Sequence, residues 1–404
     1  MQTTLAALTV ITVGYILAYL VFDRLRDRYG YVGGAEYVII GFLLGPHVTG
    51  LLGAVQVQDL TPIVSLALGW LGMLLGTYFR LPSLALVPGE HLRSAFAEAL
   101  TTFGCALLTI TLLFHLGLGY GWPDTMVQAV TLASVATLSS PAAVDVVARR
   151  SSGSAITPVL QLTARIDAVV AVAAFGLILA IYHQGQVAPS VRPPTATEWA
   201  VINLGIGVAC GVLFHLFLGP SSHLNGAEGN SRLFVALAGA IVIASGASYY
   251  LNLSPIFTNV VLGFILTNTG SAHRDVTRLL RATERPVYLA LLIFAGAAWS
   301  PGPRELLFIA PVFVLIRLSA RLAGGWLAGT RVVPPELKTP RLGRALLAQG
   351  GLAVALAVNY GQVHPELNPD VLLTATLVSV LLFEIVAGRE AGTLGPPAPE
   401  LLPK

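Results

Sequence analysis

The sequence predicts an all-α polytopic membrane protein with thirteen transmembrane helices. The composition points to this fold class: of 404 residues, 55% are hydrophobic and only 11% are charged, and the mean hydropathy is +0.77. A soluble domain carries about 25% charged residues. Because a helix needs about 20 apolar residues to cross a bilayer, we searched for segments of that length. The predicted spans are residues 4–22, 35–53, 60–79, 94–118, 125–148, 156–183, 198–218, 232–250, 254–270, 285–299, 305–329, 342–361 and 370–388.

The distribution of basic residues supports this count, because cytoplasmic loops are enriched in Lys and Arg. If the odd-numbered gaps between spans and the C-terminal tail lie inside, they hold 18 of the 23 Lys and Arg residues. The outer gaps hold only Arg192 and Arg304, and the remaining three arginines lie within spans. We therefore expect a multi-pass protein of the cytoplasmic (inner) membrane, in contact with lipid, with its N-terminus outside and its C-terminus in the cytoplasm.

Two pairs of segments indicate an inverted repeat. The motif GFLL (41–44) in the second span is echoed by GFIL (263–266) in the ninth, and the fifth and twelfth spans are both interrupted by helix-breaking residues. The interrupting residues are Ser139, Ser140 and Pro141 in the fifth span and Gln349, Gly350 and Gly351 in the twelfth. Seven spans, an odd number, separate the members of each pair. Matched broken spans mark a transporter site, because half-helix ends carry partial charge; the alternative is a kink or close packing through small residues.

Asp167 is the most informative single residue. It lies about twelve residues into the sixth span, roughly 18 Å along the helix axis, in a run that is nearly free of charge. An ionisable residue at that depth marks an ion or proton pathway by default. Burial raises the proton affinity of a carboxylate and a nearby cation lowers it, and carboxylate oxygens are hard ligands for small cations. We therefore predict that Asp167 exchanges a proton for a metal cation; the alternative is a structural ion pair with Arg165 or Arg321.

The eleventh span carries Arg317 and Arg321 at positions i and i+4, on one helix face. An arginine stays charged when buried, so each needs an anion or carbonyl oxygens. We expect one of them, preferably Arg321, to compensate the charge of Asp167 or of the broken twelfth span. Arg165 precedes Asp167 by two residues, a spacing that points the two side chains apart, and we assign it no role.

Other carboxylates in or near the spans lie close to the predicted inner surface. We expect these residues to be solvated or paired with loop arginines; the alternative is an inner funnel that attracts cations. They are Glu98, Asp145 and Glu384. Glu284 is expected in the first turn of the tenth span, where a carboxylate stabilises a helix N-terminus.

Several function classes find no support in the sequence. It has no Walker loop, dinucleotide fingerprint, zinc spacing or nucleophile elbow, so we expect neither an enzyme nor a resident cofactor. The basic residues are spread over short loops, so we expect no nucleic-acid partner. Cys105 and Cys210 lie mid-helix and are expected to be small hydrophobes rather than a disulfide or metal framework.

The residues above resemble the monovalent cation:proton antiporter superfamily, which has the sodium/proton exchanger fold. The resemblance covers nearly the whole membrane part, and the order and spacing of the motifs carry it. The similar stretches are AEYVIIGFLLGP (35–46), ATLSSPAAV (136–144), ARIDAVVAV (164–172), SARLAGGW (319–326) and QGGLAVALA (349–357).

The resemblance implies thirteen helices, an elevator mechanism and a homodimer. Asp167 matches the ion- and proton-carrying aspartate, Arg321 the basic residue paired to the core, and Ser139 and Ser140 the polar crossing-helix positions. The implied domains are dimerisation helices in 1–93 and 219–299, core helices in 94–183 and 300–388, a linker loop and helix in 184–218, and a short cytoplasmic tail in 389–404.

One position departs from the family pattern. Ile166 stands where relatives have Asn or Asp before the aspartate, and it can neither ligate a cation nor carry a proton. One titrating carboxylate and an arginine partner indicate one proton per cation, that is, electroneutral exchange of sodium, or of potassium. The alternatives are partner-gated potassium efflux and a non-transporting membrane scaffold or sensor built on a degenerate exchanger.

Overall fold

A computed structural model describes residues 35–141, 144, 156–183, 192, 194–218, 227–269, 273–300 and 302–390. Every regular element in these ranges is a helix. The predicted first span (4–22), Asp145, most of the predicted linker loop and nearly all of the predicted tail lie outside the described residues.

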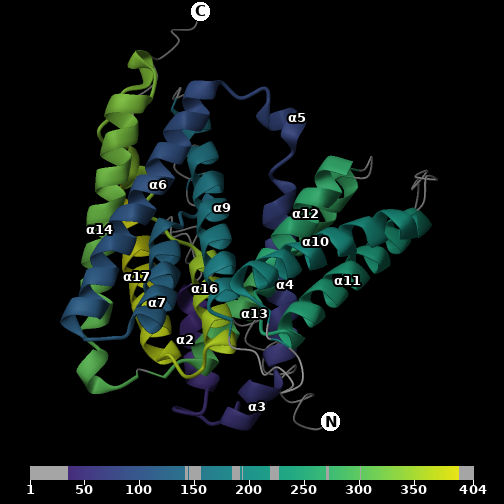
Figure 1. The fold of residues 1–404 in the computed structure, drawn as a ribbon, viewed down its shortest axis with the longest axis horizontal. Coiled ribbons are helices and arrows are strands. Elements are labelled where there is room, and N and C mark those ends of the chain that lie inside the picture. The colour runs from purple at the N-terminus through teal and green to yellow at the C-terminus, as the bar shows by residue number, and fades with distance from the viewer. Residues whose placement is uncertain are drawn as a thin grey trace, which may run out of the picture.

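The long helices pack as two bundles, which stand side by side in Figure 1. The first bundle contains α6 (Gly89–Leu112), α7 (Trp122–Thr137), α9 (Thr157–Ile181), α14 (Ile309–Leu327), α15 (Leu342–Ala345), α16 (Gly351–Val363) and α17 (Pro369–Glu390). The second bundle contains α2 (Ala35–Leu44), α4 (Thr61–Thr77), α10 (Ala196–Leu218), α11 (Ala227–Tyr250), α12 (Pro255–Thr269) and α13 (His273–Ala298). The short helices α3 (Ala54–Asp59) and α5 (Leu81–Leu84) lie in the connections.

The described helices agree with a multi-pass membrane protein. Each predicted span that falls within the described residues contains a helix, and six helices are long and apolar enough to cross a bilayer. Leucine, isoleucine and valine side chains point outward from the lipid-length helices α6, α10 and α11, as expected of surfaces that face lipid. Examples are Leu100, Leu108, Val201, Leu216, Val235 and Ile243.

Four predicted boundaries were wrong by five residues or more. α11 begins at Ala227 rather than near residue 232, and the other three differences have a local reason. α2 ends at Leu44 rather than near residue 53, because Gly45 and Pro46 follow it and break the helix. α6 begins at Gly89 and α13 begins at His273, five and twelve residues earlier than predicted. Both early turns carry charged residues on one face, which a hydropathy window does not register as helix. Glu284 therefore lies in the middle of α13, not in its first turn.

Glycines bring helix backbones together in the second bundle. A Cβ atom at Gly41 of α2 would overlap the carbonyl oxygen of Ile293 in α13, and one at Gly263 of α12 would overlap that of Met73 in α4. Small residues allow this close approach between membrane helices. Gly41 and Gly263 are the first residues of the echoed GFLL and GFIL motifs, so the echo marks two equivalent helix contacts.

The two bundles are joined by neutral hydrogen bonds and by one stacked arginine. The hydrogen-bonded side-chain pairs are Ser254 and Asn359 (2.7 Å), Ser65 and Gln362 (3.3 Å), and Trp299 and Thr374 (2.9 Å). His183 Nε2, after α9, also bonds the carbonyl oxygen of Leu251, after α11, at 2.6 Å. Arg165 of α9 stacks 5.3 Å from the ring centre of Tyr78, which follows α4, and Arg281 of α13 lies 5.2 Å from the same ring. Arg165, to which the sequence assigned no role, thus contacts the second bundle rather than Asp167.

Candidate functional site

Two helices of the first bundle are broken, close to the predicted positions. α7 ends at Thr137, residues 138–140 are not helical, and Pro141 is again helical. The predicted break at 139–141 is therefore shifted by one residue, because proline suits a first helical position, where no N–H bond is lost. In the other helix, residues 346–350 separate α15 from α16, and Gly351 is the first residue of α16.

The two breaks meet and bind each other. The backbone N–H of Ser140 donates to the carbonyl oxygen of Ala348 at 2.8 Å. Gly350 has φ of +66°, and a Cβ atom there would lie 2.9 Å from the Cβ of Ser140. Glycine is needed here on both counts, because other residues rarely adopt this φ and because the second chain passes so close.

The end of α7 is capped by side chains from other helices. The last carbonyl groups of a helix have no partner within it and carry partial negative charge. Here the Val135 carbonyl accepts a hydrogen bond from Gln349 Nε2 at 2.6 Å, and the Leu138 carbonyl accepts one from Arg317 Nη2 at 3.1 Å. The Thr137 carbonyl accepts a bond from Arg321 Nη2. Both arginines of α14 therefore face the broken end of α7.

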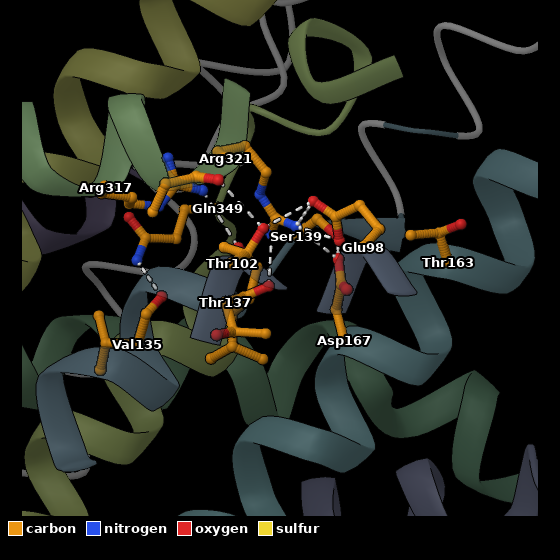
Figure 2. Close-up of polar contacts among 12 residues, drawn as sticks. Glu98, Thr102, Val135, Thr137, Ser139, Thr163, Asp167, Arg317, Arg321 and Gln349 are labelled. Carbon is orange, nitrogen blue, oxygen red and sulfur yellow. Dashed lines mark hydrogen bonds and ion pairs between the residues drawn. The ribbon is translucent and has the colours of Figure 1, made fainter. Parts of the chain in front are cut away.

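Asp167 lies beside this end, as the eleventh residue of α9, and is fully buried. Its Oδ2 atom accepts hydrogen bonds from Ser139 Oγ at 2.5 Å and from Arg321 Nη1 at 2.9 Å (Figure 2). Its Oδ1 atom is also buried and has no hydrogen-bond partner among the described residues. The structure thus brings together three predicted site residues and leaves one carboxylate oxygen unused.

Glu98 is the functional candidate that the sequence reasoning placed wrongly. It is fully buried, and both of its carboxylate oxygens lie 2.8–2.9 Å from Arg321 Nη1. Thr102 Oγ1, one turn later on α6, donates to Glu98 Oε1 at 2.9 Å. The prediction that Glu98 is solvated or paired with a loop arginine was wrong, because α6 begins at Gly89, which puts Glu98 about 14 Å along the helix.

Four charged side chains share this buried region. The guanidinium of Arg317 is fully buried and lies 4.3 Å from the ring centre of Phe383. Arg321 Nη1 contacts the carboxylates of both Glu98 and Asp167, which lie on the same side of the guanidinium in Figure 2. When both carboxylates are ionised, the two arginines and the two carboxylates have a formal net charge of zero. This balance matters because a buried charge without a partner is very costly.

The other predicted break residues connect elements of the bundle. Gln349 uses both ends of its amide, since its Oε1 also accepts a hydrogen bond from Ser379 Oγ of α17 at 2.7 Å. A Cβ atom at Gly351 would overlap the hydroxyl group of Tyr288 in α13. These residues hold the break in place and do not reach Asp167.

Two further positions clarify the chemistry of the site. Ile166 is buried in an apolar cluster with Ala95 and Ala99 of α6, so the residue before Asp167 packs against α6 and adds no polar group to the site. Glu384 is 6% exposed, so of the two predicted states, solvated or paired with a loop arginine, burial rules out the first. Among the described residues, no group of three or more His, Cys, Asp or Glu side chains could hold a resident metal ion.

Comparisons with known proteins agree with this architecture. No protein-family model matches the chain, and no curated protein matches it in sequence. In fold it is similar to the sodium proton antiporter MjNhaP1 from Methanocaldococcus jannaschii at pH 8, with a TM-score of 0.68 at 14% identity, over 96% of this chain and 99% of that chain. A structure of MjNhaP1 from electron microscopy gives a TM-score of 0.61 at 13% identity, over 95% of both chains. The exchanger fold predicted from the sequence is thereby confirmed: this multi-pass membrane protein has the fold of a sodium/proton antiporter.

Proposed function

We propose that the protein is a secondary active antiporter that exchanges a monovalent cation, sodium or alternatively potassium, for protons at Asp167. One observation carries the proposal: a fully buried aspartate, beside the broken end of α7, has one carboxylate oxygen held by Ser139 and Arg321 and the other without a partner among the described residues. Carboxylate oxygens suit small cations and protons alike. The free oxygen is therefore where either one binds.

Charge balance supports an electroneutral exchange. With Glu98 and Asp167 ionised and both arginines charged, the buried cluster is neutral. One proton or one monovalent cation on Asp167 changes the charge by the same amount. A cycle that carries a cation one way and a proton the other way then moves no net charge.

The two bundles support an elevator mechanism. The first bundle holds Asp167, both breaks and Arg321, and we propose that it is the core domain. We propose that this bundle moves against the second bundle, which forms a homodimer, and exposes Asp167 to each side of the cytoplasmic membrane in turn. The C-terminus lies on the cytoplasmic side in this proposal.

The test is an assay in proteoliposomes that contain a pH-sensitive dye. A proton gradient is set, Na+, K+ or Li+ is added outside, and the voltage is clamped with K+ and valinomycin. We expect a cation-dependent pH change that is insensitive to voltage and is lost in Asp167→Asn. Asp59→Asn, an exposed aspartate at the end of α3, is the matched control and keeps exchange.

Two outcomes would contradict the proposal in different ways. Voltage-driven exchange would mean that charge moves in each cycle and that a second group titrates. No pH response of the wild-type protein to any of the cations would instead support the non-transporting scaffold or sensor.

A further inference from the structure

We propose that Glu98 is a positioning residue: it is the permanent counter-charge of Arg321, and this frees Asp167 to bind a proton or a cation. This inference rests on the proposed exchange at Asp167. It assigns different tasks to two buried carboxylates that contact the same guanidinium nitrogen.

The contacts of the two carboxylates are unequal. Glu98 turns both oxygens toward Arg321 Nη1, at 2.8 and 2.9 Å, and Thr102 donates a further hydrogen bond to it. Asp167 uses only Oδ2 toward Arg321, and that atom also accepts a bond from Ser139. Asp167 Oδ1 has no partner among the described residues. The geometry therefore ties Glu98 to the arginine and leaves Asp167 partly unengaged.

The reason for two carboxylates follows from the cost of a buried charge. When Asp167 takes up a proton or a cation, its attraction to Arg321 weakens. An arginine left without an anion in a fully buried site would be strongly destabilised. Because Glu98 remains in contact, Arg321 keeps a counter-charge whether Asp167 is empty, protonated or occupied by a cation.

Removing the charge of Glu98 gives a measurable effect on exchange. In Glu98→Gln, Asp167 becomes the only anion that contacts Arg321, so a proton and a cation both compete with the full charge of the arginine. We expect the half-saturating cation concentration to rise about tenfold and the acid limb of the rate–pH profile to move about one unit toward lower pH. The two shifts have one cause, since both ligands bind the same carboxylate.

Companion variants separate charge from packing. Glu98→Asp retains the negative charge, and we expect it to restore the pH profile of the wild type. Thr102→Val removes the hydrogen bond to Glu98 together with a longer one, at 3.4 Å, to the Ala320 carbonyl, and we expect a smaller shift in the same direction. Glu90→Gln, an exposed carboxylate in the first turn of the same helix, is the matched control and leaves the profile unchanged.

A second measurement does not depend on transport. Thermal unfolding of the purified protein in detergent compares Glu98→Gln with Asp167→Asn. Glu98→Gln is expected to lower the melting temperature by roughly 5 °C or more, because it removes the closer partner of Arg321. Asp167→Asn is expected to lower it by less, because Arg321 keeps Glu98.

The outcomes distinguish this inference from the proposed function. In one outcome, the wild type exchanges ions and Glu98→Gln keeps the pH profile and the cation dependence of the wild type. That result would refute the role of Glu98 and leave the proposed antiport at Asp167 in place. If the wild type exchanges nothing, the proposed function fails, and equal melting temperatures for the Glu98 and Asp167 variants would refute the pairing as well. If Glu98→Gln does not fold, an unshifted profile for Thr102→Val would refute the positioning role.

Discussion

The two bundles solve the same problem, polar groups buried within a membrane, with different chemistry. Among the described side chains, the buried charged residues Glu98, Asp167, Arg317, Arg321 and Glu384 all belong to the first bundle. The second bundle buries neutral groups instead, and glycines bring its helices into contact. The difference separates helices that carry groups able to change their charge from helices that keep one state.

Neutral pairs connect α10, α11 and α12 in the second bundle. Thr258 Oγ1 donates to Asn203 Oδ1 at 2.6 Å, and Asn259 Nδ2 donates to Ser245 Oγ at 3.0 Å. None of these groups titrates near neutral pH, so these buried contacts do not depend on proton binding. A bundle of this kind suits a fixed scaffold.

The largest effect is expected from a substitution that removes the charge balance of the first bundle. Arg321→Met leaves Glu98 and Asp167 close together without their shared cation. We expect the free energy of unfolding to fall by about 3–5 kcal/mol and cation exchange to be lost. Thermal unfolding in detergent and the proteoliposome assay measure the two effects. Arg331→Met, at an exposed arginine beyond the same helix, is the control. Equal stability of the two variants would contradict the claim that Arg321 stabilises the buried carboxylates of Glu98 and Asp167.

A glycine substitution tests the packing of the second bundle. In Gly263→Ala the new Cβ atom overlaps the backbone of Met73, so we expect a loss of about 1–3 kcal/mol in unfolding free energy. The pH profile of the protein that remains folded should be unchanged, because no charged group is near. Gly246→Ala of α11, which meets nothing within 4 Å, should not be destabilising. A shifted pH profile in Gly263→Ala would show that the two bundles are not chemically separate.

Gly350→Ala probes the contact between the two breaks. We expect a loss of about 1–2 kcal/mol from the left-handed backbone conformation alone, and a further loss with slower exchange from the contact with Ser140. Gly50→Ala is the matched control, because Gly50 has the same φ of +66° but nothing within 4 Å of the added Cβ atom. Equal melting temperatures for the two variants would mean that the contact with Ser140 contributes nothing.

The smallest effects are expected when one hydrogen bond is removed from each bundle. Ser379→Ala removes the donor to Gln349, and Ser248→Ala removes the donor to Thr258. Each should cost about 1 kcal/mol in unfolding free energy. Only Ser379→Ala should change the exchange rate, because Gln349 holds the end of α7 beside Asp167. Equal exchange rates for the two variants would argue against that role of Gln349.

Much of the fold could be predicted from the sequence because the bilayer imposes simple rules on it. Apolar length located the helices, and Asp167 and Arg321 stood out as charges in apolar runs. The breaks were visible as Ser-Ser-Pro and Gln-Gly-Gly. The echoed GFLL and GFIL motifs indicated an inverted repeat, and both of their glycines lie in close helix contacts.

The position of Glu98 could not be predicted in the same way. The depth of a residue in a helix depends on where the helix begins, and the charged first turn of α6 obscured its start at Gly89. The pairing with Arg321 joins residues 223 positions apart, which no local pattern encodes. One local signal was present, the spacing of Glu98 and Thr102 by one helical turn within an apolar segment.

The neutral hydrogen bonds between the bundles have a mechanical consequence. The pairs of Ser254 with Asn359, Ser65 with Gln362, and Trp299 with Thr374 each contribute about 1 kcal/mol net. Bonds of this strength can open one after another and re-form with water or new partners, so a sliding bundle meets only low barriers. Motions of whole domains then remain accessible on the microsecond to millisecond scale. A buried ion pair at the same places would cost several times more to break and would fix the bundles in a single relative position.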